Sequence, residues 1–370
     1  MKKRVLFVFG TRPEAIKMAP IIKEFQKHPE AFILKVCVTG QHKEMLQQVM
    51  DFFGLVADFN LSLMQHNQTL FDITANVLKG IEGVLNQYEA DYLFVQGDTT
   101  TAMAGALAGY YKKIKVCHVE AGLRSGDIFS PFPEEVNRRI VSTLCSYHFA
   151  PTQMAKENLT KENYTDNIFI TGNTVIDALL WGVEKVREDT AISQQFSFLS
   201  DKQKIILVTA HRRESFGEPF RHICNALKEI AIANPEFNIV YPVHLNPNVQ
   251  QVVYETLQDQ PNIHLIKPLD YPSLIWLMDK SRFVLTDSGG IQEEAPSLGK
   301  PVLVLRNVTE RQEGITAGTA LLVGTDKKLI ISEVQKLIDD ESHYTTMAKA
   351  VNPYGNGTAA KKITSILLNT

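Results

Sequence analysis

The stretch HVEAGLRSGDIFSPFPEE, residues 118–135, decides how the chain is organised. The apolar run 115–119 predicts a buried strand, and Glu120 follows it directly. Pro133 suits the first position of a helix, where a missing N–H costs nothing, so Glu134 and Glu135 fall in the first helical turn. Because ligands of open α/β sheets bind at the carboxyl ends of the strands, this stretch predicts carboxylates at the rim of a sheet.

These carboxylates have a structural as well as a functional interpretation. Acidic residues are common in a first helical turn because they complement the helix dipole, which is reason enough for Glu134 and Glu135 taken separately. Glu120 differs, because a carboxylate directly after a buried strand needs either a partner or a function. From this segment alone both interpretations stand.

Composition limits the class of protein. The chain has 370 residues, of which 44% are hydrophobic and 21% charged, which is enough for two domains with full cores. A net charge of −3 provides no basic field for nucleic acid or a membrane surface, so local groups must bind any anion.

The termini and cysteines indicate a cytoplasmic protein. The apolar run 5–9 is too short for a signal peptide, and no apolar run reaches the roughly 20 residues of a membrane span. The four cysteines have no CxxC spacing, which predicts reduced thiols and no metal site of the cysteine type.

Strands and helices alternate through both halves, which predicts two doubly wound, Rossmann-like α/β domains, residues 1–172 and 173–354, facing a cleft. The polar stretch 188–204 is expected to be a connector. The predicted strands are 4–9, 32–38, 91–95, 115–119, 147–150, 168–171, 205–209, 237–243, 263–266, 283–285 and 301–305.

Polar residues at other strand ends extend the first rim. Arg12 and Lys17 come near the start of the helix after strand 4–9, where an anion can bind, although solvated surface residues are an equal alternative. Asp98 follows strand 91–95 and is either an N-cap or a third rim carboxylate beside Glu120 and Glu134.

The second half carries signals for a phosphate. Ser288, Gly289 and Gly290 lie between a strand and a helix, where free N–H groups suit a diphosphate, although tight turns also favour glycine. Nearby strand ends add basic groups, namely His211, Arg212, Arg213, Arg306 and Arg311. The GxGxxG and GxxxxGK[ST] fingerprints are absent, so no nicotinamide or ATP site is expected.

An ordered set of motifs resembles the bacterial non-hydrolysing UDP-N-acetylglucosamine 2-epimerases over nearly the whole chain. The motifs are GTRPE (10–14), GDT (97–99), HVEAGLR (118–124), PEE (133–135), HRRE (211–214) and TDSGG (286–290). The resemblance implies a glycosyltransferase B-type (GT-B) fold, with a final helix in 355–370 that crosses back to the first domain. It also implies interconversion of UDP-N-acetylglucosamine (UDP-GlcNAc) and UDP-N-acetylmannosamine (UDP-ManNAc) for cell-envelope polysaccharide, usually by a homodimer.

The resemblance also implies roles for matching residues. The catalytic residues would be Asp98, Glu120, Glu134 and His211. UDP would be held by Arg12, Lys17, Ser288, Gly289, Gly290, Glu294 and Arg311, with Glu294 on the ribose. An allosteric UDP-GlcNAc would contact Gln41, Arg212 and His244.

The chain departs from the family pattern at three places. Gln312 stands where the family has proline, and Ser215 where it has asparagine. Asn67 stands where some members have an arginine that helps to hold the allosteric UDP-GlcNAc. We therefore expect weak or absent activation by UDP-GlcNAc.

The expected chemistry is elimination of UDP and its re-addition through 2-acetamidoglucal, which needs stabilisation of the leaving diphosphate and carboxylates near the sugar. It requires no redox cofactor and no metal. The alternatives are a UDP-sugar glycosyltransferase of the same fold, a hydrolysing epimerase and a non-catalytic sugar-nucleotide sensor.

Overall fold

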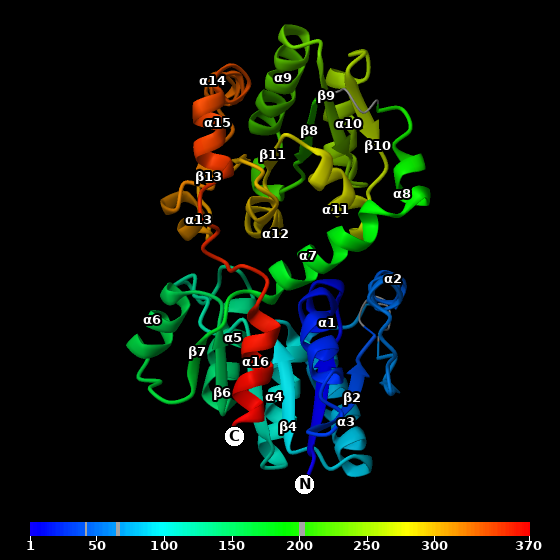
Figure 1. The fold of residues 1–370 in the computed structure, drawn as a ribbon, viewed down its shortest axis with the longest axis vertical. Helices are drawn as coiled ribbons and strands as arrows, with labels where there is room; N and C mark the ends of the chain where they lie inside the picture. Colours follow the sequence, from blue (N-terminus) through cyan, green and yellow to red (C-terminus); the bar gives the residue numbers. More distant parts are fainter. Residues whose placement is uncertain (41–42, 64–66, 200–203) are drawn as a thin grey trace. The chain divides into compact units, whose positions relative to one another are not determined.

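A computed structural model describes residues 1–40, 43–63, 67–199 and 204–370, and it divides into two compact units. The first unit consists of Met1–Ala178 with Tyr354–Thr370, and the second of Leu179–Pro353. Each unit has its own parallel sheet, with helices between consecutive strands (Figure 1). The prediction of two doubly wound α/β units is confirmed.

The sheet of the first unit has the strand order β3-β2-β1-β4-β5-β6-β7. Order reverses between β1 and β4, which is the kind of switch point where α/β proteins bind ligands. The strands are β1 (Lys3–Phe9), β2 (Phe32–Val38), β3 (Phe59–Asn60), β4 (Tyr92–Gln96), β5 (Lys115–Val119), β6 (Tyr147–Ala150) and β7 (Ile168–Ile170).

Alternating side chains attach helices to both faces of this sheet. Leu6 and Val8 belong to the core under α3, α4 and α5. Phe7 points the other way, stacks on Phe94 at 4.8 Å and meets Phe25 of α1 edge-on at 5.7 Å. Strands buried on both faces must be apolar throughout, which explains the continuous hydrophobic runs.

The helices of the first unit include the last helix of the chain. Figure 1 shows α16 beside α1, and the two helices are in contact. The helices are α1 (Arg12–Gln26), α2 (Lys43–Phe53), α3 (Leu70–Gln87), α4 (Thr100–Tyr111), α5 (Glu134–Leu144), α6 (Gln153–Lys161), α7 (Thr174–Arg187), which continues into the second unit, and α16 (Ala359–Leu368).

Capping residues set several helix starts. Thr11 caps α1 in a reciprocal capping box with Glu14, and Thr69 caps α3 in the same way with Asp72. The expected helical position of Pro133 is wrong by one residue, because Pro133 is the N-cap of α5 and Glu134 is its first residue.

The second sheet has the order β10-β9-β8-β11-β12-β13. Its strands are β8 (Lys204–Thr209), β9 (Phe237–Pro242), β10 (Ile263–Ile266), β11 (Phe283–Thr286), β12 (Val302–Val304) and β13 (Ala320–Leu322). Its helices are α8 (Thr190–Gln195), α9 (Glu218–Ala233), α10 (Pro247–Leu257), α11 (Tyr271–Lys280), α12 (Gly289–Glu294), α13 (Gln312–Thr316), α14 (Lys327–Asp339) and α15 (Glu341–Ala348).

The expected connector 188–204 contains structure of its own. Asp189 caps α8 by accepting from the amides of Ala191 and Ile192, and Phe196 then stacks on Trp276 of α11 at 4.8 Å. The packing of Phe196 stabilises a helix here, although the polar sequence of this stretch favours one only weakly. No helix in the described part of the chain is long and apolar enough to cross a membrane.

Candidate functional site

Glu120 is a nearly buried carboxylate at the rim of the first sheet. It follows β5 with a left-handed φ of +65° and is 8% exposed. Its Oε1 accepts from Lys17 Nζ at 2.5 Å and from Asn173 Nδ2 at 3.0 Å, and its Oε2 accepts from Gln96. Donors on both oxygens stabilise the ionised form of a buried carboxylate.

A glycine two residues after Glu120 explains how the chain turns here. Gly122 has φ +91°, and a Cβ on it would lie 2.1 Å from the carbonyl oxygen of Ala155. Only glycine allows the backbone so close to α6.

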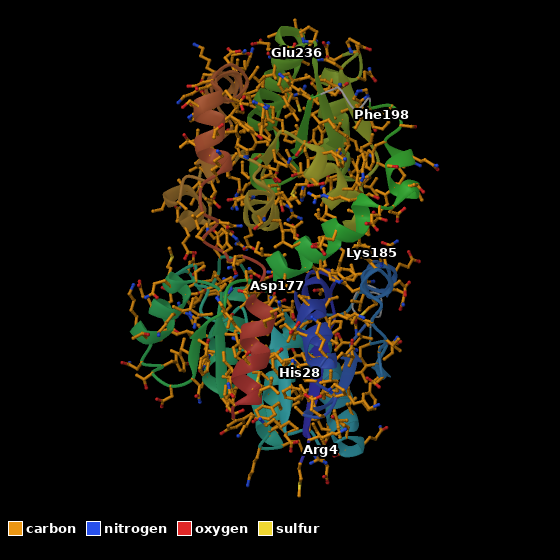
Figure 2. All side chains as sticks on the ribbon, in the orientation of Figure 1. Arg4, His28, Asp177, Lys185, Phe198 and Glu236 are labelled. Atoms are coloured by element: carbon orange, nitrogen blue, oxygen red, sulfur yellow. The ribbon has the colours of Figure 1, made fainter. Side chains whose placement is uncertain are left out.

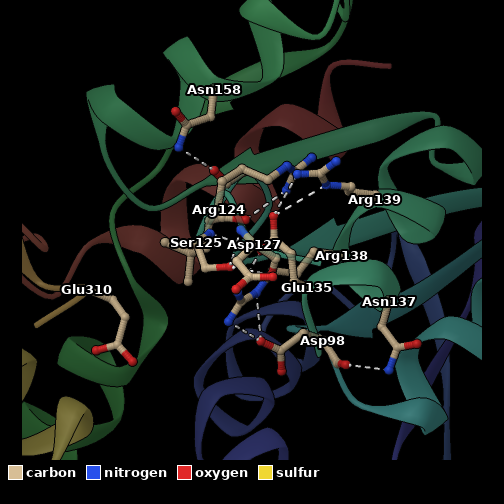
Figure 3. A network of polar contacts seen from close by, with 12 residues as sticks. Asp98, Arg124, Ser125, Asp127, Glu135, Asn137, Arg138, Arg139, Asn158 and Glu310 are labelled. Carbon is tan, nitrogen blue, oxygen red and sulfur yellow. Dashed lines mark hydrogen bonds and ion pairs between the residues drawn. The ribbon is translucent and has the colours of Figure 1, made fainter. Parts of the chain in front are cut away.

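Asp98 lies in the turn after β4 and pairs with α5. Its carboxylate accepts from Arg138 Nη2 at 2.6 Å and Nε at 2.8 Å, and its carbonyl accepts from Asn137 Nδ2 at 2.9 Å (Figure 3). The N-cap alternative for Asp98 is wrong, because the hydroxyl of Thr99 caps α4. Asp98 is therefore a rim carboxylate with a cation beside it.

Glu134 and Glu135 are adjacent in α5 but differ in their surroundings. Oε2 of Glu134 is buried and has no hydrogen-bond partner among the described residues. Glu135 is fully buried and accepts from the Ser125 amide at 2.9 Å and from Arg138 at 3.1 Å (Figure 3). Burial alone would raise the pKa of Glu135, but these hydrogen bonds and that of Arg139 outweigh it, and the pKa is lowered.

Two residues of α1 were expected to hold an anion. Arg12 is the first residue of α1 and is partly buried, and Lys17 lies further along the helix, where it pairs with Glu120. The structure thus brings Lys17 to the rim carboxylates.

Glu14 was missed as a rim residue, although its capping-box spacing from Thr11 is visible in the sequence. It accepts from the amides of Gly10 at 3.0 Å and Thr11 at 2.7 Å and from the hydroxyl of Thr99 at 2.6 Å. Burial raises its pKa despite these hydrogen bonds. Glu14 therefore ties the turn after β1 to the turn that carries Asp98.

The second unit brings the predicted nucleotide-binding residues together around α12. Ser288 is the N-cap, and a Cβ on Gly289 would lie 3.1 Å from Cζ of Arg311. Arg311 Nε donates to Glu293 Oε1 at 2.9 Å, and Glu294 Oε1 accepts from Tyr271 OH at 3.0 Å. Gly290 is in the first turn of α12, where a Cβ would have contacts no closer than 3.9 Å.

Asp287 organises the strand end that carries His211. Its Oδ2 accepts from the amides of His211 at 2.6 Å and Arg212 at 2.7 Å. Its Oδ1 is buried without a hydrogen-bond partner in the described part of the chain and lies 3.6 Å from His211 Nδ1. Burial lowers the pKa of His211, Asp287 opposes that effect, and His244 and Arg212 add to it.

The residues expected at an allosteric site are only partly described. His244 stacks on His211 with ring centroids 5.0 Å apart, and Arg212 adjoins His211. Asn67 has φ +59°, a conformation that asparagine adopts more readily than most residues. Gln41 lies outside the described residues.

Arg306 was considered as a phosphate donor, but the structure gives it other partners. Its guanidinium donates to Glu214 Oε1 at 2.6 Å and to Glu310 Oε2 at 2.8 Å. Two carboxylates therefore already engage this cation. Within the described ranges, no group of three or more His, Cys, Asp or Glu side chains is placed to hold a metal ion.

The architecture and the two sets of side chains define a protein of the GT-B class. One Rossmann-like unit bears carboxylates at its rim, and the other bears a glycine turn with basic groups. A glycosyltransferase from Rickettsia africae shares the fold, with a TM-score of 0.63 at 14% identity over 99% of this chain and 97% of that one.

The particular family follows from sequence comparison. The profile of the UDP-N-acetylglucosamine 2-epimerase family matches residues 23–368. The UDP-N-acetylglucosamine 2-epimerase of Salmonella typhimurium is 54% identical over 369 residues, covering 98% of both chains. That of Campylobacter jejuni is 53% identical over 377 residues, covering 100% of this chain and 98% of the relative. The chain belongs to this family and is an isomerase.

Solved structures agree with this assignment. The UDP-GlcNAc 2-epimerase from Neisseria meningitidis, solved bound to UDP-GlcNAc, has a TM-score of 0.91 at 49% identity, covering 99% of this chain and 100% of that chain. The Methanocaldococcus jannaschii enzyme, in complex with UDP-GlcNAc and UDP, has a TM-score of 0.81 at 32% identity with the same coverage.

Proposed function

We propose that this chain reversibly inverts C2 of UDP-GlcNAc to give UDP-ManNAc without net hydrolysis. The observation that carries the proposal is the environment of Glu120, a nearly buried carboxylate at a sheet rim with donors on both oxygens. The family membership and the UDP-GlcNAc in the related Neisseria structure support the choice of substrate.

The proton on C2 has no adjacent carbonyl to make it acidic, so the C1–O bond to UDP must break first or nearly so. A base removes the C2 proton, the C2–H electron pair forms the C1=C2 double bond, and the C1–O pair leaves with UDP. The resulting 2-acetamidoglucal then accepts a proton at the opposite face of C2, and a phosphate oxygen adds back to C1. Positioned acids and bases of this kind typically accelerate a step by about 10²–10⁴-fold.

The three rim carboxylates have surroundings that suit different roles. Glu120 accepts from donors on both oxygens and suits proton transfer at C2 and stabilisation of positive charge near C1. Oε2 of Glu134 has no hydrogen-bond partner in the described part, so it suits proton exchange at C2. Asp98 is paired with Arg138 and suits the supporting role of orienting the sugar.

The family resemblance assigns nucleotide-binding roles to residues within each unit. Arg12, Lys17 and Arg311 supply cations, and the 288–290 turn offers backbone N–H groups for the diphosphate. Glu294 would accept from the ribose, and His211 would stabilise the leaving phosphate.

We also propose that the units close on UDP so that water is excluded during the reaction. Small-angle scattering profiles unchanged by UDP would contradict closure.

One incubation tests the reaction. The chain is given UDP-GlcNAc alone in D₂O, and the products are followed by proton NMR. We expect UDP-ManNAc with deuterium at C2, and scrambling of a bridging ¹⁸O label into the diphosphate. A glycosyltransferase would form no epimer without an acceptor, and a hydrolysing epimerase would release free N-acetylmannosamine. Protium retained at C2 would contradict elimination.

Activation by UDP-GlcNAc is proposed to be weak, because Asn67 offers no charge to a phosphate. A charge-assisted hydrogen bond typically contributes about 1.5–3 kcal/mol. Rates that rise hyperbolically with UDP-GlcNAc are expected. A strongly sigmoidal curve that His244→Ala abolishes would show that the regulatory site operates with asparagine.

We further propose a cytoplasmic homodimer that supplies N-acetylmannosamine units for cell-envelope polysaccharide. The four cysteines are free, as expected in a reducing compartment. The assembly is tested by light scattering on the purified chain, and a monomer at working concentration would contradict it.

A further inference from the structure

Asn173 is a buried residue whose four polar groups all have partners, the backbone carbonyl accepting from the Ile176 amide at 3.1 Å. It is 3% exposed. Its backbone N–H donates to the carbonyl oxygen of Tyr354 at 2.7 Å, and its side-chain Oδ1 accepts from the Val175 amide at 3.1 Å. Its Nδ2 donates to Glu120 Oε1 at 3.0 Å. Because an amide group is planar, holding Oδ1 in the first turn of α7 also fixes the direction of Nδ2.

These partners lie where the chain passes between its two units. The chain leaves the first unit after Ala178, within α7, and returns at Tyr354. Asn173 comes five residues before the first passage and bonds the first residue after the second. A single residue thus contacts both passages and Glu120, the returning passage through its backbone N–H and the start of α7 and Glu120 through its side chain.

Two further contacts within the first unit hold the passages together. Asp177 accepts from the amides of Ala359 at 3.2 Å and Ala360 at 2.9 Å, at the start of α16 (Figure 2). A Cβ on Gly172, which has φ +92°, would lie 3.4 Å from the carbonyl oxygen of Tyr354. Burial raises the pKa of Asp177, against the hydrogen bonds from the two amides. Hydrogen bonds and van der Waals contact therefore link the two passages within the first unit.

We propose that Asn173 is a positioning residue that couples the orientation of the Glu120 carboxylate to these two chain passages. A movement of the start of α7 or of residues near Tyr354 would swing Nδ2 and change the hydrogen bonding of Glu120. The coupling acts on the carboxylate in the first unit, and it rests on the proposed role of Glu120 in epimerisation. It adds a physical link between the two chain passages and Glu120, through which domain closure would change the hydrogen bonding of that carboxylate.

A double-mutant cycle tests the coupling. Asn173→Ala and Asn173→Asp are made alone and combined with Glu120→Gln, and the aspartate variant keeps an acceptor for the Val175 amide. Asn173→Ala and Asn173→Asp, each made alone, are expected to lower kcat roughly 10- to 100-fold, which is the range for losing one hydrogen bond to a charged group. In the Glu120→Gln background, Asn173→Ala should add about twofold or less. UDP affinity by calorimetry should stay within about threefold of wild type, because the 288–290 turn and Arg311 are intact.

The control is Asn234→Ala, which removes an equally buried asparagine, 4% exposed, that bonds the Ile230 carbonyl in the second unit. It should lower Tm with an unchanged kcat in either background. Equal losses from Asn173→Ala in both backgrounds would show a merely structural role and overturn the proposal.

The passages themselves are tested through Asp177→Asn. It should lower kcat about three- to tenfold, and this loss should disappear when Asn173→Ala is already present. A loss that persists there would overturn the proposed link to the passages. A wild-type chain that binds UDP but forms no epimer would instead contradict the proposed function, independently of the cycle.

Discussion

The rims of the two sheets carry opposite charge arrangements on the same architecture. In the first unit, carboxylates occupy the strand ends and basic or amide groups hold them, as Lys17 holds Glu120 and Arg138 holds Asp98. In the second unit, Arg311 lies near the rim and a carboxylate holds it, that of Glu293. The Asp287 carboxylate likewise holds the backbone of His211 by accepting from its N–H.

The difference shows that the doubly wound fold positions side chains without choosing their chemistry. Parallel strands present their carboxyl ends at one edge, and the residues after each strand decide the charge there. A rim of carboxylates suits proton transfer and cation stabilisation, whereas a rim of donors suits a diphosphate. The predictions below test whether these two functions separate.

The largest effect is expected from Glu120→Gln. This change keeps the shape of the side chain and removes its charge, and it should lower kcat about 10²–10⁴-fold. UDP affinity should change about threefold or less, because Arg311 and the 288–290 turn stay intact and Lys17 keeps its charge. Rates are measured by proton NMR and binding by calorimetry. Glu89→Gln is the matched control, because the Glu89 side chain is 84% exposed and pairs with Arg4 at the surface, and it should leave both values unchanged.

The second prediction removes a cation from the rim of the second sheet. Arg311→Gln should weaken UDP binding about 10- to 100-fold, because a charge-assisted hydrogen bond to phosphate is lost. It also removes the cation beside Glu293, which is 2% exposed, so the Arg311→Gln/Glu293→Gln double variant controls for an uncompensated buried charge. A double variant that binds UDP like wild type would exclude Arg311 from the nucleotide site.

A third prediction concerns the buried histidines of the first unit. Burial lowers the pKa of His118 to about 3 and that of His148 to about 4. These two histidines bind protons more readily in the unfolded chain than in the folded one. The free energy of unfolding is therefore highest above about pH 6.5, where both rings are neutral in either state, and it falls as the pH is lowered toward 4. Between pH 7 and pH 5, the free energy of unfolding should therefore fall by about 2 kcal/mol less in His148→Phe than in the wild type.

Urea unfolding at both pH values measures this difference. His264 in the second unit is only partly buried, and burial lowers its pKa, so His264→Phe is the control and should change the pH dependence less than His148→Phe does. Equal effects from the two variants would contradict the assignment to burial.

The smallest effect is expected from Asp287→Asn. Asp287 opposes the lowering of the His211 pKa, so removing its charge should lower that pKa further. Less His211 is then protonated at neutral pH, and turnover should fall roughly tenfold with its optimum moved to lower pH. NMR titration of labelled histidine follows His211 directly. A pKa of His211 that rises in this variant would contradict the electrostatic account.

The sequence predicted much of the fold and the candidate site because their signals are local. A continuous apolar run means a strand buried on both faces, and the residue after it lies at the sheet rim whatever the remainder of the chain does. That reasoning placed Asp98, Glu120 and the 288–290 turn at their strand ends. The bounds of the predicted strands lie within one residue of the observed ones.

The partners of these residues were decided only by tertiary structure. Lys17 and Glu120 are 103 positions apart, and His211 and Asp287 are 76 apart, so no periodicity relates them. Each pair meets because strand order and helix packing bring distant rim positions together. The same holds for Asn173, which in sequence is one asparagine in a turn. Its contact with Glu120 exists because the packing of the first unit brings the residue before α7 to the residue after β5.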